Sequence, residues 1–357
     1  MARSAAEELA IAEACDARGD HDEAINALAR ATKLGDVEAT TRLGKRLLVG
    51  KDAPLLPIQG ARFLADAVQH GGAEAPAKLA ILAAAGVYVD PSLDGALRLL
   101  AMSAERGWQV AQSQLLALTP DRELAAVAAQ NPAPTSLWRQ LAASIDLELW
   151  TSAPQRNVLN ESPLICTFDE FLPRAVCEWL IARSTGLLKR ALVYDAVESR
   201  DYASEQRTNS WAQFDLMGCE LIHLLVQRRM QAACGLPLVN MEATAILHYS
   251  VGEEIKNHFD FVDPETPNYE EEIRKNGQRV LTFLVYLNDD YEGGETEFVE
   301  LGIVHRGWRG QGLFFINALE NGGPDLRSEH AGRPPTSGEK WIVSQFVRNR
   351  QVLGLAG

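Results

Sequence analysis

Apolar side chains in the first third of the chain recur at three- and four-residue spacing, which predicts amphipathic helices. The pattern repeats without a gap: Gly35, Gly71 and Gly107 stand 36 residues apart. Five further sets of residues keep the same register: Ala24, Gly60 and Ala96; Leu28, Leu64 and Leu100; Ala29, Ala65 and Ala101; Ala39, Ala75 and Ala111; and Leu43, Leu79 and Leu115. Six aligned positions indicate an internal repeat with a period of 36 residues, which covers about residues 5–117.

Each repeat has the pattern of two helices whose small residues permit close packing. The glycines at 35, 71 and 107 follow a predicted helix end, where glycine accepts the left-handed conformation. A single helix pair cannot cover its own apolar face, so successive pairs stack. We therefore expect residues 1–117 to form an α-α solenoid.

The pattern loosens between residues 118 and 162. The breaker Asn131-Pro132-Ala133-Pro134 precedes a predicted helix over Leu137–Trp150, and a polar stretch follows. These residues are the expected linker between two domains.

From residue 163 to 357 the pattern changes to short apolar runs separated by Gly and Asp/Asn turns. A strand and a helix come first, at Leu164–Phe168 and between Asp169 and Leu188. Further strands are expected at Thr244–Tyr249, Arg279–Leu287, Gly312–Ile316 and Lys340–Val347. This order predicts a double-stranded β-helix, or jelly roll, with supporting helices, and a multidomain α+β chain overall.

Composition narrows the classes of protein that fit. With 357 residues, 46% of them hydrophobic, the chain can bury sizeable cores, and its formal net charge of −14 disfavours nucleic-acid and anionic-membrane partners. The five cysteines are scattered without a C-x-x-C pair, which favours a reducing compartment. Neither a signal-peptide pattern nor an apolar run near the roughly 20 residues of a membrane span occurs. We expect a cytoplasmic protein.

The candidate chemistry begins at His258-Phe259-Asp260. Side chains two residues apart on a strand share a face, so His258 and Asp260 can reach one ion. With His330 from a later strand they form a two-His, one-carboxylate set, which suits Fe(II) and leaves coordination positions open. Lys340, ten residues after His330, can place an ammonium at the far end of the pocket to bind a carboxylate.

Further motifs accompany these four residues: Tyr249, Tyr286-Leu287-Asn288-Asp289, Gly293-Gly294-Glu295-Thr296, His330-Ala331-Gly332 and Gly338-Glu339-Lys340-Trp341. Over residues 163–350 this combination resembles the 2-oxoglutarate- and Fe(II)-dependent dioxygenases, in their prolyl 4-hydroxylase-like branch. The N-terminal repeats resemble the SEL-like relatives of tetratricopeptide repeats, which commonly bind proteins or peptides.

The resemblance implies roles for individual residues. His258, Asp260 and His330 would be the iron ligands, and Lys340 would bind the distal carboxylate of 2-oxoglutarate, with Tyr249 and Thr296 helping to hold it. Tyr286 and Ser344 are weaker candidates for the same pocket. Arg207 and Trp341 are candidates for contact with the substrate.

Two positions depart from the branch, and both concern the substrate. Ile255 stands where the branch often has tyrosine, and Asn209 replaces a serine in the segment Arg207-Thr208-Asn209-Ser210.

The leading hypothesis is a hydroxylase of prolyl residues in a protein or peptide, which converts 2-oxoglutarate and O2 to succinate and CO2. Ascorbate is a candidate reductant. The repeats are candidates for docking the polypeptide, and the alternative is that they only pack against the following domain and stabilise it. Hydroxylation of another amino acid or of a small molecule remains an alternative, as does a non-catalytic peptide-binding protein. A zinc hydrolase fits less well, because no H-E-x-x-H motif is present and Lys340 would be unexplained.

Overall fold

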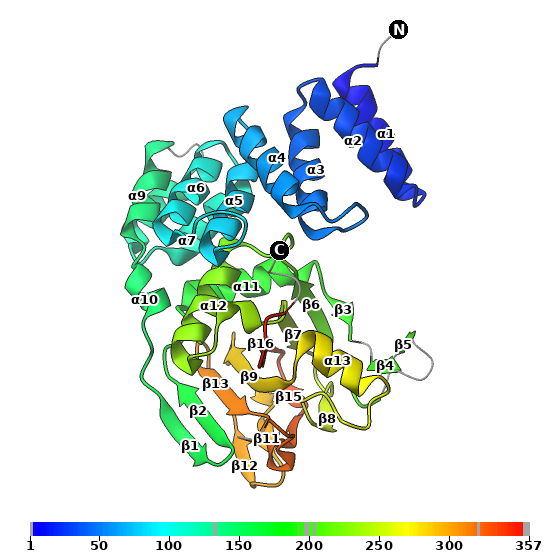
Figure 1. Ribbon diagram of the computed structural model, residues 1–357. Helices are drawn as coiled ribbons and strands as arrows, with labels where there is room; N and C mark the ends of the chain where they lie inside the picture. The colour runs from blue at the N-terminus through cyan, green and yellow to red at the C-terminus, as the bar shows by residue number, and fades with distance from the viewer. Residues whose placement is uncertain are drawn as a thin grey trace. The chain divides into compact units, whose positions relative to one another are not determined.

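The computed structural model describes residues 3–130, 134–191, 193–195, 200–202, 205–319 and 322–352. The chain forms two compact units. The first holds the residues up to Leu147 together with Leu216–Leu225, and the second holds Glu148–Asp215 and Val226–Ala356. The first unit is helical and the second combines antiparallel sheets with helices (Figure 1). Within the described ranges, every helix is too short or too polar to cross a lipid bilayer.

Nine helices in the described residues precede position 147: α1 (Ala5–Ala17), α2 (His21–Lys33), α3 (Val37–Val49), α4 (Pro57–Gln69), α5 (Glu74–Ala85), α6 (Leu93–Glu105), α7 (Gln109–Leu118), α8 (Arg122–Ala128) and α9 (Ser136–Ser144). The later helices are α10 (Leu147–Thr151), α11 (Arg174–Thr185), α12 (Leu221–Cys234) and α13 (Tyr269–Asn276), with 3-10 turns η1 (Leu238–Asn240) and η2 (Leu326–Ser328).

The predicted repeat of paired helices is confirmed, since α2, α4 and α6 begin 36 residues apart and end 36 residues apart. Each is followed by its glycine, with φ of 87° at Gly35, 87° at Gly71 and 86° at Gly107. Left-handed backbone of this kind strongly favours glycine. The recurring glycine therefore sets where each repeat turns.

Leu28, Leu64 and Leu100 are fully buried, as their shared register predicts. Helices α3 and α4 touch through a glycine pair: a Cβ on Gly60 would lie 2.6 Å from the Gly44 carbonyl oxygen. One aligned position behaves differently, because Ala65 is exposed on its helix. In the aligned set of Ala29, Ala65 and Ala101, a small side chain therefore does not always mean close packing between helices.

The continuous helix expected over residues 137–150 is wrong. Helix α9 ends at Ser144, and Ile145 is extended with ψ of 122°. The Ser144 hydroxyl donates to the Leu141 carbonyl oxygen and also bonds the Thr119 hydroxyl at 2.6 Å. Serine side chains that bond the backbone in this way compete with helix continuation.

The second unit contains sixteen strands among the described residues: β1 (Asn157–Glu161), β2 (Leu164–Phe168), β3 (Lys189–Arg190), β4 (Val193–Asp195), β5 (Arg200–Tyr202), β6 (Ser210–Phe214), β7 (Thr244–Tyr249), β8 (Ile255–His258), β9 (Arg279–Tyr286), β10 (Glu292–Gly293), β11 (Thr296–Phe298), β12 (Ile303–His305), β13 (Gly312–Ile316), β14 (His330–Gly332), β15 (Pro335–Ser337) and β16 (Lys340–Arg348).

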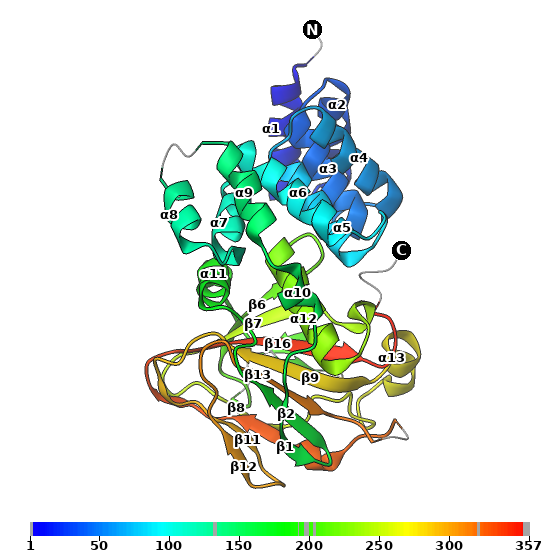
Figure 2. The same cartoon turned by 90° about the vertical axis from the view of Figure 1, so that its left-hand side faces the viewer.

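Eight of these strands form the main sheet, in the order β1-β2-β13-β9-β16-β7-β6-β3. A smaller sheet has the order β12-β11-β14-β8, and β10-β15 and β4-β5 are separate pairs. Strands β2, β13, β9, β16 and β7 of the main sheet can be followed in Figure 2. The strand pairs of the described residues are antiparallel, and β16 lies between β9 and β7. Strand β16 thus joins two strands that are distant from it in sequence.

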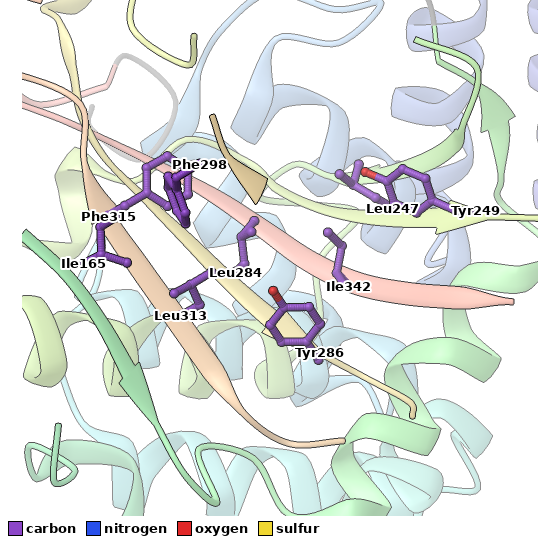
Figure 3. Packing of buried hydrophobic residues seen from close by; sticks show 9 residues of the cluster. All are labelled: Ile165, Leu247, Tyr249, Leu284, Tyr286, Phe298, Leu313, Phe315 and Ile342. Atoms are coloured by element: carbon purple, nitrogen blue, oxygen red, sulfur yellow. The ribbon is translucent and has the colours of Figure 1, made fainter. Parts of the chain in front are cut away.

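The core of the second unit follows strand alternation. Leu247 and Tyr249 on β7, Leu284 and Tyr286 on β9 and Ile342 on β16 belong to one buried cluster (Figure 3). Cluster members from the other strands are Ile165, Phe298, Leu313 and Phe315. Lys340 is paired with Tyr249 in the strand register, which places it beside this cluster.

Candidate functional site

Two histidines and one aspartate converge where β8 and β14 pair. His258 ends β8, His330 begins β14, and the two are opposite each other in the register. Asp260 follows two residues after His258, and ligand atoms of all three residues lie within 4.8 Å of one another. The aspartate oxygens approach both imidazoles, with Oδ1 3.4 Å from His258 Nε2 and Oδ2 3.4 Å from His330 Nε2.

Both imidazoles are oriented by the backbone. The His258 Nδ1 lies 2.8 Å from the Lys256 carbonyl oxygen, and the His330 Nδ1 lies 3.0 Å from the Ser328 carbonyl oxygen. Each Nδ1 therefore donates, and each Nε2 is left with a lone pair directed at the shared centre. Two neutral imidazoles and a carboxylate in this arrangement fit a first-row divalent metal.

Electrostatics keep Asp260 ionised. Burial opposes its ionisation, but the facing imidazoles of His330 and His258 hold the pKa of the Asp260 carboxyl well below its usual range. Burial likewise opposes protonation of His258, and the contact with Asp260 nevertheless raises the pKa of that imidazole. This attraction between carboxylate and imidazole depends on a proton between them, and a metal cation bound by the three residues would take the place of that proton.

These three residues line a pocket of about 420 Å³. Four other residues singled out from the sequence also line it: Lys340, Tyr249, Thr296 and Arg207. Ser344 lines the same pocket, and Tyr286 lies in the cluster behind it. The strands thus bring together residues that are up to 137 positions apart in the chain, from Arg207 to Ser344.

Lys340 is deeply buried in the wall of this pocket, with 1% of its surface exposed. Its Nζ is 5.1 Å from the centre of the Tyr249 ring and 5.7 Å from that of Tyr286. Among the described residues, no carboxylate pairs with this ammonium. Burial lowers the pKa of Lys340 to about 7, and the charge of Glu295 opposes the shift. A buried cation without an ion pair facing a cavity is a site for an anionic ligand.

Hydroxyl groups accompany the ammonium. The Tyr286 hydroxyl and the Thr296 Oγ1 are 2.9 Å apart. Burial raises the pKa of both Tyr249 and Tyr286, so their hydroxyls stay protonated and able to donate. A Cβ at Gly307 would overlap the Tyr286 ring at 2.1 Å, which explains the glycine there.

The remaining wall of the pocket combines aromatic and charged groups. The Arg207 guanidinium lies 5.7 Å from the Trp211 ring centre, and its Nε donates to Asn209 Oδ1 at 3.2 Å. Phe259 and Phe346 also line the pocket. This surface can bind a group that is part apolar and part hydrogen-bonding.

Trp341 is not among the pocket-lining residues of the described chain. Strand alternation explains this, because its neighbour Lys340 faces the pocket and Trp341 therefore faces the opposite side. The Trp341 ring packs against that of His248 at 4.3 Å. Trp341 therefore lies outside the pocket lining, whereas Trp211 belongs to it.

Several residues of the site escaped sequence reasoning. Thr282 donates from Oγ1 to Asp260 Oδ2 at 2.7 Å, across 22 positions of sequence. Glu242 and Arg279 line the pocket as a bidentate pair, with distances of 2.7 and 2.9 Å. No sequence motif signals either of these contacts. The one available signal for Thr282 is strand alternation, which puts it on the same face of the strand as Leu284 and Tyr286.

Comparisons with known proteins agree with this geometry. A sequence model of the 2OG-Fe(II) oxygenase superfamily matches residues 244–348, which hold all four central residues. Probable prolyl 4-hydroxylase 6 of Arabidopsis thaliana is 30% identical over 214 residues, covering 54% of this chain and 71% of that protein. Prolyl 4-hydroxylase 1 of the same plant is 29% identical, with the same coverage of 54% and 71%.

Animal and viral proteins are similar as well. The prolyl 4-hydroxylase subunit alpha-1 of Rattus norvegicus is 28% identical over 191 residues, covering 53% of this chain and 35% of that protein. Among solved structures, the viral collagen prolyl hydroxylase of Paramecium Bursaria Chlorella virus-1 in its 2OG complex has 24% identity and a TM-score of 0.40, covering 52% of this chain and 96% of that chain.

Residues 244–348 therefore place the second unit in the 2OG-Fe(II) oxygenase superfamily. Within that superfamily, the chain belongs to the prolyl 4-hydroxylase family. It is a dioxygenase that uses Fe(II), 2-oxoglutarate and O2.

Proposed function

We propose that this enzyme hydroxylates a prolyl residue in a protein or peptide, and that His258, Asp260 and His330 hold its iron. The observation that carries the proposal is the placement of this trio and the unpaired Lys340 ammonium in one pocket. The relatives named prolyl 4-hydroxylases favour proline as the target over other residues.

In this assignment Lys340 binds the distal carboxylate of 2-oxoglutarate through a charge-assisted hydrogen bond. Tyr249 donates to the remaining oxygens at that end. Tyr286 donates to Thr296, whose own hydroxyl hydrogen is then free for an oxygen of the co-substrate. When bound, iron and 2-oxoglutarate supply the oxidising chemistry that gives succinate, CO2 and a hydroxylated product. The protein orients the co-substrate and keeps water from its charged end.

The opposite part of the pocket receives the substrate. The rings of Trp211, Phe259 and Phe346 offer flat apolar surfaces that suit a pyrrolidine ring. Arg207, with its Nε held by Asn209, has further N–H groups available for a peptide carbonyl oxygen. Ile255 lines the same pocket and replaces a hydroxyl donor with an apolar contact.

We also propose the finer architecture. Residues 163–357 would form a double-stranded β-helix, with the two larger sheets as its walls, and residues 118–162 would be the linker. Residues 1–117 would form a solenoid that docks the polypeptide substrate. All five cysteines are free thiols, which supports a reducing, cytoplasmic location. We propose ascorbate as the reductant.

The test is oxygen-dependent succinate release with proline-containing peptides, combined with mass spectrometry of the peptide. We expect a mass gain of one oxygen on proline and loss of turnover in His258→Ala. If oxygen is added only to another residue or to a small molecule, proline is not the target. Substrate-stimulated turnover that persists in His258→Ala would overturn the iron assignment.

A further inference from the structure

Two successive hydrogen bonds support Asp260 from behind the proposed metal site. Thr282 Oγ1 donates to Asp260 Oδ2 at 2.7 Å, and Asn317 Nδ2 donates to Thr282 Oγ1 at 2.9 Å. Asp260, Thr282 and Asn317 are 6%, 1% and 0% exposed. These three residues, which we call the Asp260 relay, are thus shielded from bulk water.

The direction of the relay is fixed by its chemistry. A carboxylate can only accept, so the single hydroxyl hydrogen of Thr282 must point at Asp260. The Thr282 oxygen is then free to accept from the Asn317 amide. If the Asn317 amide were turned over, its oxygen would face the hydroxyl oxygen with no hydrogen between them.

The relay also joins the two sheets of the second unit. Thr282 lies on β9 of the main sheet, and Asn317 follows β13 of the same sheet. Asp260 follows β8 of the smaller sheet, and Lys340 starts β16 next to β9. The bond from Thr282 therefore sets the position of the carboxylate relative to the strands that carry Lys340.

We propose that Thr282, oriented by Asn317, is a positioning residue that engages one oxygen of Asp260 and leaves the other for the metal. This inference rests on the metal site proposed above. Partners that fix a ligand in this way usually contribute about 10- to 100-fold to metal affinity.

The experiment is a Mn²⁺ titration of the full-length protein, with free Mn²⁺ followed by electron paramagnetic resonance. Mn²⁺ accepts the same nitrogen and oxygen ligands without the oxidation chemistry of iron. Thr282→Val removes the hydroxyl at nearly constant volume, and we expect Mn²⁺ affinity to fall about 10- to 100-fold. Thr282→Ser keeps the hydroxyl, so its Mn²⁺ affinity should stay within about threefold of wild type.

Thr244→Val is the matched control. Thr244 is 3% exposed on β7 of the same sheet, and its hydroxyl bonds Gln345 and Gln227 instead of Asp260. We expect this variant to bind Mn²⁺ like the wild type. Asn317→Leu should weaken binding less than Thr282→Val, because the hydroxyl stays but loses its orientation.

Two failures can be told apart. If His258→Ala binds Mn²⁺ as tightly as the wild type, the metal site itself is misassigned. If His258→Ala loses binding while folded Thr282→Val stays within about twofold of wild type, the relay has no positioning role. Should Thr282→Val fail to fold, wild-type affinity in Asn317→Leu would overturn the role of the relay.

Discussion

Burial of Lys340 disfavours its charged form, whereas the proposed role of Lys340 requires that charge. Its ammonium has almost no exposed surface, and burial lowers its pKa to about 7. A lysine that served only the fold would be replaced at little cost by an apolar side chain, which often stabilises a protein. The conflict is resolved when the distal carboxylate of 2-oxoglutarate binds beside the ammonium and stabilises its charged form.

This conflict predicts a pH-dependent affinity for 2-oxoglutarate. Below a pH of about 7 the free enzyme carries a charged Lys340, and above it the side chain is increasingly neutral. Since the bound carboxylate requires the charge, binding above that pH takes up a proton. Affinity should therefore fall as pH rises from 7 to 9, by up to about tenfold per unit.

Calorimetry of the anaerobic Mn²⁺ enzyme in buffers of different ionisation enthalpy would count the protons. The control is Lys340→Arg, whose guanidinium stays charged across this range. Its 2-oxoglutarate binding should lose most of the proton uptake at pH 8. Equal uptake by both proteins would show that another group titrates.

At the scale of single residues, the sequence predicts those members of the site that belong to recognisable motifs. His258, Asp260, His330 and Lys340 are recognisable because their chemistry requires these residue types at these spacings. Thr282 and Asn317 are 22 and 57 positions from Asp260, and only strand pairing brings them near it. Threonine and asparagine also have many ordinary roles in sheets and turns, so their presence carries little information.

Helix α3 and helix α4 illustrate packing at the scale of elements. A Cβ at Gly60 would stand 2.6 Å from the Gly44 carbonyl oxygen and 2.7 Å from the Leu48 nitrogen. Both are backbone atoms, so a rotamer change cannot relieve the overlap. The two helices can approach this closely because both positions lack a side chain.

Gly60→Ala should therefore destabilise the repeat region. Alanine gains about 1 kcal/mol of helix propensity over glycine, but overpacking costs typically 1–3 kcal/mol, and here the backbone must move. We expect a net loss of about 1–2 kcal/mol in the free energy of unfolding. Denaturation in urea, followed by circular dichroism, would measure it.

Gly186 provides the control for this substitution. It caps α11 with a φ of −79°, and a Cβ there would meet nothing within 4 Å. Gly186→Ala should change stability by less than about 0.5 kcal/mol. A Gly60→Ala protein as stable as Gly186→Ala would mean that α3 and α4 are not packed through glycine.

Elements with a long periodic pattern are those that the sequence predicts well. Strands β2, β7 and β13 have the predicted bounds, and β9 and β16 differ from them by one residue. Short strands such as β8, β11 and β14 hold three or four residues, too few to establish a period. Their strand state comes from pairing with each other, which local sequence does not encode.

At the scale of the molecule, the boundaries of compact units do not follow the order of the chain. The first unit contains the helical repeats and also Leu216–Leu225. Within this unit the buried Lys78 Nζ donates to Glu220 Oε1 at 3.2 Å and to the Met217 carbonyl oxygen at 3.1 Å. Gln114 contributes as well, because its Oε1 accepts from the Ile222 amide at 3.2 Å.

This arrangement affects how substrate docking by the repeats can be tested. Removing residues 1–117 would remove both Lys78 and Gln114 and leave the Glu220 carboxylate without them. Loss of turnover in such a truncation would then report damaged folding as readily as lost docking. Comparing long and short substrates on the full chain avoids this confusion.

The buried pair itself gives the last prediction. Lys78 and Glu220 side chains are 4% and 3% exposed, so Lys78→Met removes a cation from beside a buried carboxylate. Breaking such a pair costs about 3–5 kcal/mol, whereas replacing both charges by apolar groups is often nearly neutral. Lys78→Met should therefore speed hydrogen exchange of the amides in Leu216–Leu225, and adding Glu220→Met should partly restore their protection.

The exposed pair Arg174–Glu178 is the control, with side chains 74% and 54% exposed. Exposed pairs contribute about 0–1 kcal/mol, so Arg174→Met should leave exchange in Leu216–Leu225 unchanged. If Lys78→Met behaves like Arg174→Met, the segment is held by its apolar contacts alone. Truncation at residue 117 would then still expose those contacts, because Leu221, Ile222, Leu224 and Leu225 are all at most 2% exposed.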